Sequence, residues 1–302
     1  MLDRRRFLAG STALLLAAGC RAPQDVPVVR LGSGRAGGFF HEFAELLAKA
    51  ATATGAVRIE PISTAGSQQN LALIASGGLD AGLALADSLA SAQTGAVAIG
   101  RLYETYIQLA VRADSPIRHL TELRGRRVDL GVTGSGAAMT AERLLRVAGL
   151  DPATDIVPSN RQLSDGAVAL HADAVDAIFW GGGIPTPGVD IPARARLIDI
   201  GDWALPMQER FGYDYDRVII PAGAYPQAPA VWTVGVPNLL LAAPQLADSA
   251  VTAITALLLE QADALISEQT LGFHFLDRRW LVGTGGVPLH PAAADYYRDN
   301  HG

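Results

Sequence analysis

Short apolar runs that end in glycine or serine turns alternate, early in the chain, with longer stretches in which alanine and leucine recur at helical spacing. This alternation predicts three strands, 28–33, 57–63 and 79–86, separated by two helices, 39–54 and 68–76. The first helix has an apolar face made of Phe40, Phe43, Leu46 and Leu47, and Gly55 ends it. The order of these elements is that of a parallel β-α-β-α-β unit.

A second series repeats this order. Its expected elements are a short helix at 120–123, a strand at 127–132, helices at 139–147 and 167–172 and a strand at 175–180. Extended apolar runs at 107–112 and 232–241 lie on either side, and a long helix at 246–268 follows the second run. The sequence therefore predicts an α/β protein of two lobes joined by a hinge of two strands. Lobe 1 would consist of 28–111 plus 232–302, and lobe 2 of 112–231.

The first twenty residues differ from the rest of the chain. Three consecutive arginines precede a short apolar stretch that ends at Gly19-Cys20. This pattern is typical of a secretory signal and resembles a twin-arginine signal followed by a lipobox. The apolar stretch is shorter than the roughly 20 residues that a membrane span needs. We expect residues 1–19 to be removed, Cys20 to carry lipid, and residues 20–27 to tether an extracytoplasmic protein to the outer face of the cell membrane.

Charge and cysteine content limit the partners. The formal net charge is −6, and removing Asp3 and the three arginines of the signal leaves −8 for the mature chain. Nucleic acids and anionic lipid surfaces attract basic proteins, so neither is expected as the main partner. Because Cys20 is the only cysteine, the mature chain can form no internal disulfide and no paired-cysteine metal site. We expect a monomer whose contact with the membrane is its lipid anchor.

Three glycine-containing turns each precede a predicted helix, at Ser33–Phe39, Thr64–Ser67 and Thr133–Gly136. Exposed backbone amides at the start of a helix bind anions, aided by the helix dipole. Loops at the carboxyl ends of parallel strands meet at one edge of a sheet, so these turns can face one another across a cleft between the lobes. A single such turn is more often an ordinary βα turn with a Ser or Thr cap. Three together favour an anion site.

The first turn also satisfies the dinucleotide pattern G-x-G-x-x-G, from Gly32 to Gly37, and Glu60 on the next strand could bind a ribose. Against this interpretation, the ribose acid normally ends its strand, whereas Glu60 is followed by Pro61–Thr64 and a further glycine turn. An exported nucleotide-dependent oxidoreductase stays an alternative, which cofactor absorbance in the purified protein would reveal.

Motifs typical of catalysis are missing from the sequence. It contains no H-E-x-x-H, no G-x-S-x-G and no Walker A loop, and its six histidines are scattered without the spacing of metal ligands. We therefore expect a protein that is not an enzyme and that uses no cofactor and no metal.

The order of several short motifs is similar to that of the TAXI family, the TRAP-associated extracytoplasmic receptors. These motifs are the turn Gly32–Phe40, the helix Ser67–Gly77, the segments 111–115 and 123–128, the turn Gly134–Gly136 with Ala141–Leu145, and the late runs 233–237 and 288–291. The resemblance covers essentially the whole mature chain. It implies a type II-like periplasmic-binding-protein fold with an interlobe ligand cleft. It also implies that small acids such as glutamate or related dicarboxylates are captured without turnover and delivered to a TRAP-type carrier.

The chain departs from this family in the first turn, where Arg35 stands among residues that offer few other side-chain donors. A guanidinium can bind a carboxylate with two parallel hydrogen bonds. We expect Arg35 to bind a ligand carboxylate that the amides of Gly37 and Gly38 also hold. The alternative is an arginine solvated on a surface turn.

Two other candidates each have two interpretations. Asp87 could bind a ligand ammonium group or cap the helix that follows it, and Trp180 could stack on a ligand or pack in the core. The complete set of candidate ligand-binding residues is Ser33, Arg35, Gly37, Gly38, Phe39, Ser67, Asn70, Asp87, Gly134, Ser135, Gly136, Trp180 and Pro185. A lipoprotein sensor that binds the same ligand and signals to a kinase is a further alternative to a transport receptor.

The processing of the N-terminus can be tested directly. We expect mass spectrometry of the membrane fraction to find a mature chain that begins with a lipid-modified Cys20, because the apolar segment is too short to span the membrane. A Cys20→Ala variant should be released from the membrane. An uncleaved wild-type chain, or a Cys20→Ala protein that stays bound to membranes, would contradict the prediction.

Overall fold

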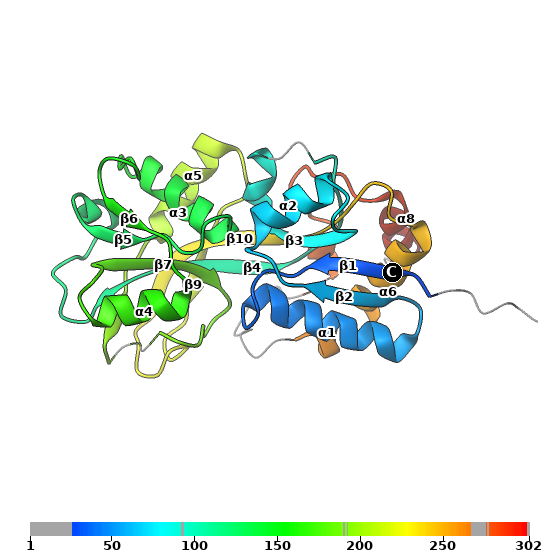
Figure 1. Cartoon of the computed structure of the whole chain (residues 1–302), viewed down its shortest axis with the longest axis horizontal. Coiled ribbons are helices and arrows are strands. Elements are labelled where there is room, and N and C mark those ends of the chain that lie inside the picture. Colours follow the sequence, from blue (N-terminus) through cyan, green and yellow to red (C-terminus); the bar gives the residue numbers. More distant parts are fainter. Residues whose placement is uncertain are drawn as a thin grey trace, which may run out of the picture.

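The computed structural model describes residues 26–300 except 92–93, 190, 192, 267–275 and 277. Its elements form two lobes that lie side by side, one built from the start and the end of the described chain and the other from its middle (Figure 1). One ten-stranded sheet runs through both lobes. None of the helices in the described ranges is both long and apolar enough to cross a membrane. The two-lobed α/β fold predicted from the sequence is confirmed.

The first lobe contains a parallel β-α-β-α-β unit. Its elements are β1 (Val28–Gly32), α1 (Phe39–Thr54), β2 (Arg58–Ile62), α2 (Ser67–Ala75), β3 (Ala81–Leu85) and the 3₁₀ helix η1 (Ala86–Ser91). Late in the chain it gains α6 (Asp248–Glu260), the 3₁₀ helix η4 (Ala262–Leu265), α7 (Arg278–Leu281) and α8 (Pro291–Asn300). α1 has the predicted bounds because its apolar face buries Phe43 and Leu47, and Gly55, with φ 68°, ends it in the left-handed conformation.

The second lobe repeats this plan. Its elements are the 3₁₀ helix η2 (Leu120–Leu123), β5 (Arg127–Asp129), α3 (Gly136–Val147), β6 (Val157–Ser159), α4 (Leu163–His171), β7 (Ala177–Gly182), β8 (Ala195–Leu197), the 3₁₀ helix η3 (Gly201–Trp203), α5 (Ala204–Phe211) and β9 (Asp216–Ile220). β5 pairs in parallel with β6 and β7, as β1 does with β2 and β3.

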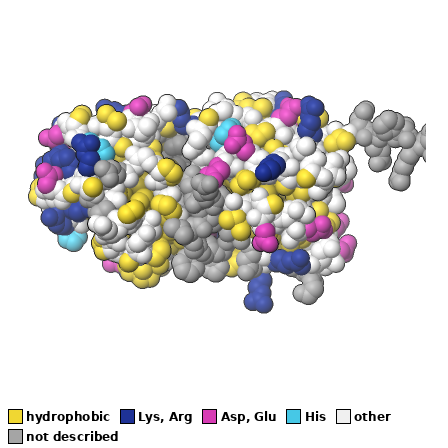
Figure 2. Space-filling model, turned by 90° about the horizontal axis from the view of Figure 1, so that it is seen from below, with side chains coloured by type: hydrophobic (Ala, Val, Ile, Leu, Met, Phe, Trp, Pro, Cys, Tyr) yellow, Lys and Arg dark blue, Asp and Glu magenta, His cyan; other side chains and the backbone are white. Residues whose placement is uncertain are grey.

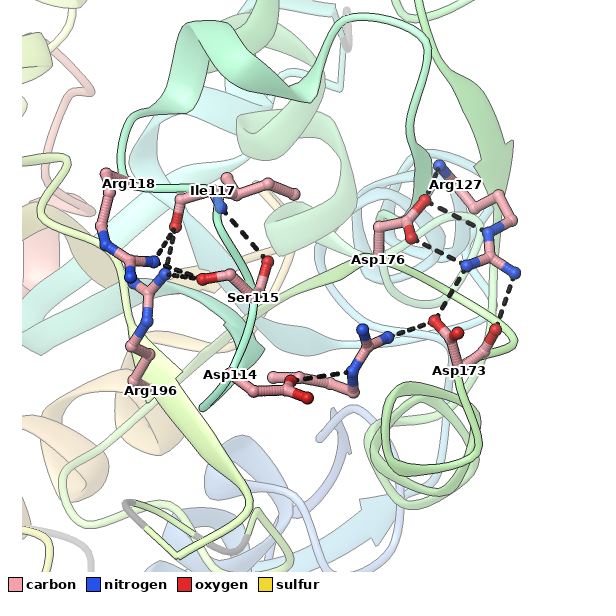
Figure 3. Close-up of polar contacts among 9 residues, drawn as sticks. Asp114, Ser115, Ile117, Arg118, Arg127, Asp173, Asp176 and Arg196 are labelled. Carbon is pink, nitrogen blue, oxygen red and sulfur yellow. Dashed lines mark hydrogen bonds and ion pairs between the residues drawn. The ribbon is translucent and has the colours of Figure 1, made fainter.

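An equivalent Arg–Asp ion pair in each lobe links its first strand to the residue before a neighbouring strand. In lobe 1, Arg30 on β1 donates to Asp80, the residue before β3, from its backbone N–H at 2.9 Å and from its guanidinium at 2.8 Å. In lobe 2, Arg127 on β5 donates to Asp176, the residue before β7, at 2.8 Å from each group (Figure 3). These hydrogen bonds hold the pKa of both aspartates below the usual value. The two units thus share one plan of assembly.

Two long strands join the lobes: β4 (Val97–Arg112) and β10 (Val231–Ala242). They pair antiparallel in the middle of the sheet, whose order is β2-β1-β3-β10-β4-β7-β5-β6. On β4, Leu102 packs in the apolar core of the first lobe and Ile107 in that of the second; on β10, Leu240 and Val236 divide in the same way. The chain therefore passes between the two cores inside these strands. The exact lobe boundaries predicted from the sequence, at 111/112 and 231/232, stay predictions.

Several predicted elements have different bounds in the structure: α3 and α4 begin earlier than predicted, β4 is much longer, and β5 and α6 are shorter. β5 ends at Asp129, before the expected 132, because Gly131 adopts a left-handed conformation with φ 87°. α6 ends at Glu260, and the 3₁₀ helix η4 follows it, so the helix predicted for 246–268 is shorter. The last two residues of that prediction lie outside the described residues.

β7 continues beyond 180, the predicted end of this strand. Gly181 and Gly182 belong to the strand, and a side chain at Gly181 would lie 2.9 Å from atoms of Ala137 and Thr105. Glycine at this position therefore lets the start of α3 approach the strand closely, which is a packing role and not a turn.

Basic and acidic side chains lie next to each other at the end of the second lobe that is far from the first (Figure 2). Among the pairs of this lobe, Arg112 at the end of β4 binds Asp114 at 3.2 Å and also contacts Asp173. Arg196 on β8 donates to the carbonyl oxygen of Ser115 at 2.9 Å (Figure 3). These contacts fix the loop that follows β4.

Glu104 is a buried carboxylate on the part of β4 that runs between the two cores. Glu104 lies on β4, 8% exposed, and its Oε1 accepts a hydrogen bond from Arg101, which also reaches Asp216 at 3.3 Å. Glu104 Oε2 has no hydrogen-bond partner within the described part of the chain. Burial raises the pKa of Glu104 to about 7; the charge of Arg101 lowers it and that of Asp216 raises it.

This raised pKa predicts a pH-dependent stability. A carboxyl whose pKa is higher in the folded state contributes stability below its ordinary value of 4.5, and this contribution is lost as the pH rises through about 7. We expect a loss on the order of 3 kcal/mol from this group between about pH 4.5 and 8. Urea unfolding of the wild type and of Glu104→Gln across this range should show the difference between them changing by that amount. Parallel pH profiles for the two proteins would contradict the prediction.

Candidate functional site: an interlobe cavity

A cavity of about 330 Å³ lies between the lobes, beside a smaller hollow of about 120 Å³. The start of α1 forms the wall from the first lobe. The ends of β5 and β7, the start of α4 and the loop at 186–188 form the wall from the second lobe. A ligand in this cavity would contact both lobes at once.

The start of α1 brings four predicted residues to the cavity: Arg35, Gly37, Gly38 and Phe39. Arg35 is exposed, and none of the described residues forms an ion pair or a side-chain hydrogen bond with its guanidinium. The amide of Gly38 donates to the carbonyl oxygen of Arg35 at 3.0 Å and is therefore already bonded. The Phe39 ring packs on Tyr103, with 4.4 Å between centroids.

The opposite wall carries an arginine that the sequence analysis did not select. Arg161 follows β6, and its guanidinium Nη1 donates to Asp129 Oδ2 at 2.8 Å and also contacts Ser159. Asp129 ends β5, and its side chain is 3% exposed. Its Oδ1 accepts the amide of Gly131 at 3.0 Å, and Ser159 donates to its Oδ2 at 2.9 Å. Asp129 thus holds Arg161 at the cavity wall and has both oxygens engaged.

The second and third glycine turns pack against each other. The amide of Gln68 in α2 donates to the carbonyl oxygen of Gly134 at 3.2 Å, and Ser67 Oγ accepts the amide of Leu85 at 3.0 Å. A side chain at Gly136 would lie 2.4 Å from Ser67 Oγ, so glycine permits this contact. Ser67 and Gly136 line the smaller hollow. The start of α2 therefore serves mainly the contact between the lobes.

Two helix starts of the second lobe border the cavity. Ser135 caps α3 by accepting the amide of Ala138 at 3.1 Å, and it lines both hollows. Gln162, Leu163 and Ser164 at the start of α4 line the larger one, although this helix start was not predicted as part of the site. The partial positive charges of α1, α3 and α4 therefore lie around one cavity.

Five predicted residues lie outside the lining: Ser33, Asn70, Asp87, Gly134 and Pro185. Ser33 is buried and donates to the carbonyl oxygen of Ile62 at 3.0 Å. The Asn70 amide donates to the carbonyl oxygens of Gly32 and Leu83, at 3.0 and 2.8 Å, and so joins β1 to β3 through α2. Pro185 follows a cis peptide bond directly before the lining loop 186–188.

Asp87 lies in a contact between the lobes. It comes from η1, whereas its partners come from lobe 2: Thr140 donates to Oδ2 at 2.8 Å, Tyr215 donates to the same atom at 3.0 Å, and Arg143 lies 3.4 Å away. Asp87 is fully buried, and burial raises the pKa of its carboxyl while the charge of Arg143 lowers it. This position suits neither a ligand contact nor a simple helix cap.

Trp180 packs in the core and also lines the cavity, and its stacking on a ligand stays a prediction. It is 4% exposed and packs with Ile178 and Tyr106 in an apolar cluster, and it also lines the cavity. Its indole Nε1 has no hydrogen-bond partner in the described ranges.

In the described residues, no group of three or more His, Cys, Asp and Glu is placed to hold a metal ion. Cys20, the predicted site of lipidation, lies outside the described residues.

The contact at Asp87 generates a stability prediction. Arg143→Met keeps most of the aliphatic volume but leaves Asp87 without its buried cationic partner, so we expect the unfolding free energy to fall by about 3 kcal/mol. Arg146→Met, on the same helix, removes only an exposed pair with Glu142 and should cost less than about 0.5 kcal/mol. Urea unfolding measures both. Equal effects of the two substitutions would show that the Asp87 contact contributes little.

Comparison with known proteins places this architecture. The structure is similar to a binding-protein component of an ABC phosphonate transporter from Pseudomonas aeruginosa, with 13% identity, a TM-score of 0.51 and coverage of 78% of this chain and 75% of that one. It is also similar to the periplasmic aliphatic sulphonate binding protein SsuA from Escherichia coli, with 20% identity, a TM-score of 0.46 and coverage of 90% and 83%. The model of the NMT1-like family matches residues 31–300, which is most of the sequence. The chain therefore belongs to the NMT1-like family.

Proposed function

We propose that this protein is an extracytoplasmic solute-binding protein that captures a small anionic metabolite between its lobes and delivers it to a membrane transporter. The observation that carries the proposal is the interlobe cavity with Arg35 on one wall, Arg161 on the other, and the starts of three helices around it. Guanidinium groups and helix starts both stabilise negative charge. The fold shared with transporter binding proteins supports the same role.

Delivery requires that the lobes open and close. β4 and β10 are the two strands that pass between the cores, so we propose them as the hinge. A ligand that contacts both walls stabilises the closed form, because it gains contacts there that the open form lacks. The carrier would then recognise the closed protein.

The carrier that we propose is of the TRAP type, on the motif order shared with the TAXI receptors from Gly32 to Pro291. The two solved structures named above bear on the fold alone. A neighbouring gene for a many-spanning sodium-coupled carrier would support the proposal. A neighbouring kinase gene would favour a sensor instead.

Ligand binding should be visible as stabilisation and compaction. At a ligand concentration of about 100 times Kd, binding adds about 2.7 kcal/mol to the unfolding free energy. We therefore expect a screen of small carboxylates to find one that raises Tm by several degrees and lowers the scattering radius. A compound that is consumed over time would instead indicate an enzyme, and a bound cofactor absorbance would indicate the oxidoreductase.

The same screen tests Arg35. With the ligand found in this way, Arg35→Ala should weaken binding by more than about tenfold, because removing one partner of a desolvated charge pair costs about 2 to 5 kcal/mol. Arg35→Lys should recover only part of the affinity, since the two-bond geometry is lost. Arg58→Ala is the matched control, because Arg58 is an exposed arginine of the same lobe that pairs with Glu60. Titration calorimetry that finds Arg35→Ala within about twofold of the control would reject this role.

A further inference from the structure

We propose that the interlobe cavity selects small organic acids that lack an ammonium group over the α-amino acids of the same carbon skeleton. This inference rests on the proposed capture of a small anion and narrows its chemical class. The arguments concern the side chains and helix starts that would surround the rest of the ligand once its carboxylate is bound.

The first argument is the sign of the charges in the cavity walls. Arg35 and Arg161 stand on opposite walls, and the starts of α1, α3 and α4 add partial positive charge. Asp129 balances the charge of Arg161, so the positive charge without a carboxylate partner in the described lining is that of Arg35 and of the helix starts. An ammonium group brought into this cavity would be repelled by this charge, and it would lose its hydration as well. A second carboxylate, a keto oxygen or a hydroxyl would meet donors instead.

The second argument concerns the carboxylates that could bind an ammonium group. Asp129 is the one carboxylate in the described lining, and it accepts hydrogen bonds from Arg161, Ser159 and the amide of Gly131. An incoming ammonium group would have to displace Arg161 to reach it. Asp87, the residue that the sequence suggested for this purpose, lies in the lobe contact with Thr140 and Tyr215.

The third argument is the apolar part of the lining. Ile178, Leu163 and Phe39 present apolar surface to the ligand body. The largely buried ring of Trp180, 4% exposed, also belongs to this lining. The walls thus fit an acid with an uncharged, partly apolar skeleton.

Matched pairs of compounds test this inference. The purified full-length chain is titrated by calorimetry with glutarate and L-glutamate, with 3-phenylpropionate and L-phenylalanine, and with further pairs that cover short, branched and aromatic skeletons. We expect at least one acid to bind, with its amino acid partner at least about tenfold weaker.

The outcomes separate this inference from the function on which it rests. An amino acid that binds as tightly as its acid, or more tightly, overturns the inference and leaves the proposed capture of small anions standing. A series in which neither acids nor amino acids bind overturns the proposed function and the inference together.

A charge variant adds a second test. Leu163→Asp places a carboxylate in the cavity wall at the first turn of α4, where an acidic residue suits the helix dipole. The acid-to-amino-acid affinity ratio should fall by about fivefold or more in this variant. Val168→Asp, at a 67% exposed position of the same helix outside the lining, should leave the ratio unchanged. A folded Leu163→Asp protein with the wild-type ratio overturns the inference.

Discussion

The antiparallel pairing of β4 with β10 is the contact on which the rest of the molecule depends. Each of these strands contributes side chains to both apolar cores, so the core of each lobe is incomplete without β4 and β10. β10 also pairs with β3, and β4 with β7, so that the parallel strands of each lobe are attached to this central pair. The helix starts at the carboxyl ends of those strands are thereby brought to opposite sides of one cavity.

Much of this arrangement could be predicted from the sequence, because it follows from local rules. Periodicity and a left-handed glycine fix α1 from Phe39 to Gly55, and the repeated β-α-β order indicates two lobes. The exposed position of Arg35 at the start of that helix also follows from its turn. What local patterns do not contain is pairing in space. Arg161 becomes a cavity residue only because β6 lies beside β5, which places it within reach of Asp129.

The incorrect or missing predictions have the same origin. Asp87 has the sequence context of a ligand residue, at the end of a strand, but its partners Thr140 and Tyr215 lie 53 and 128 residues further along the chain. Gly181 lies beyond the predicted end of its strand, yet it belongs to β7. Its lack of a side chain makes room for Ala137 at the start of α3. β9 and α5 have only 5 and 8 residues, so tertiary packing and not propensity defines them.

The two buried carboxylates at the junction bear on the proposed opening of the lobes. Glu104 and Asp87 both lie where the lobes meet, each has one oxygen without a hydrogen-bond partner in the described residues, and burial raises the pKa of each. A buried ion pair gains little net free energy, since desolvation offsets the attraction. Opening would return water to such groups, which recovers part of the cost of breaking the contact. A junction of this kind would not strongly oppose the proposed opening, so that the free energy of a ligand that contacts both walls could decide between the two proposed forms.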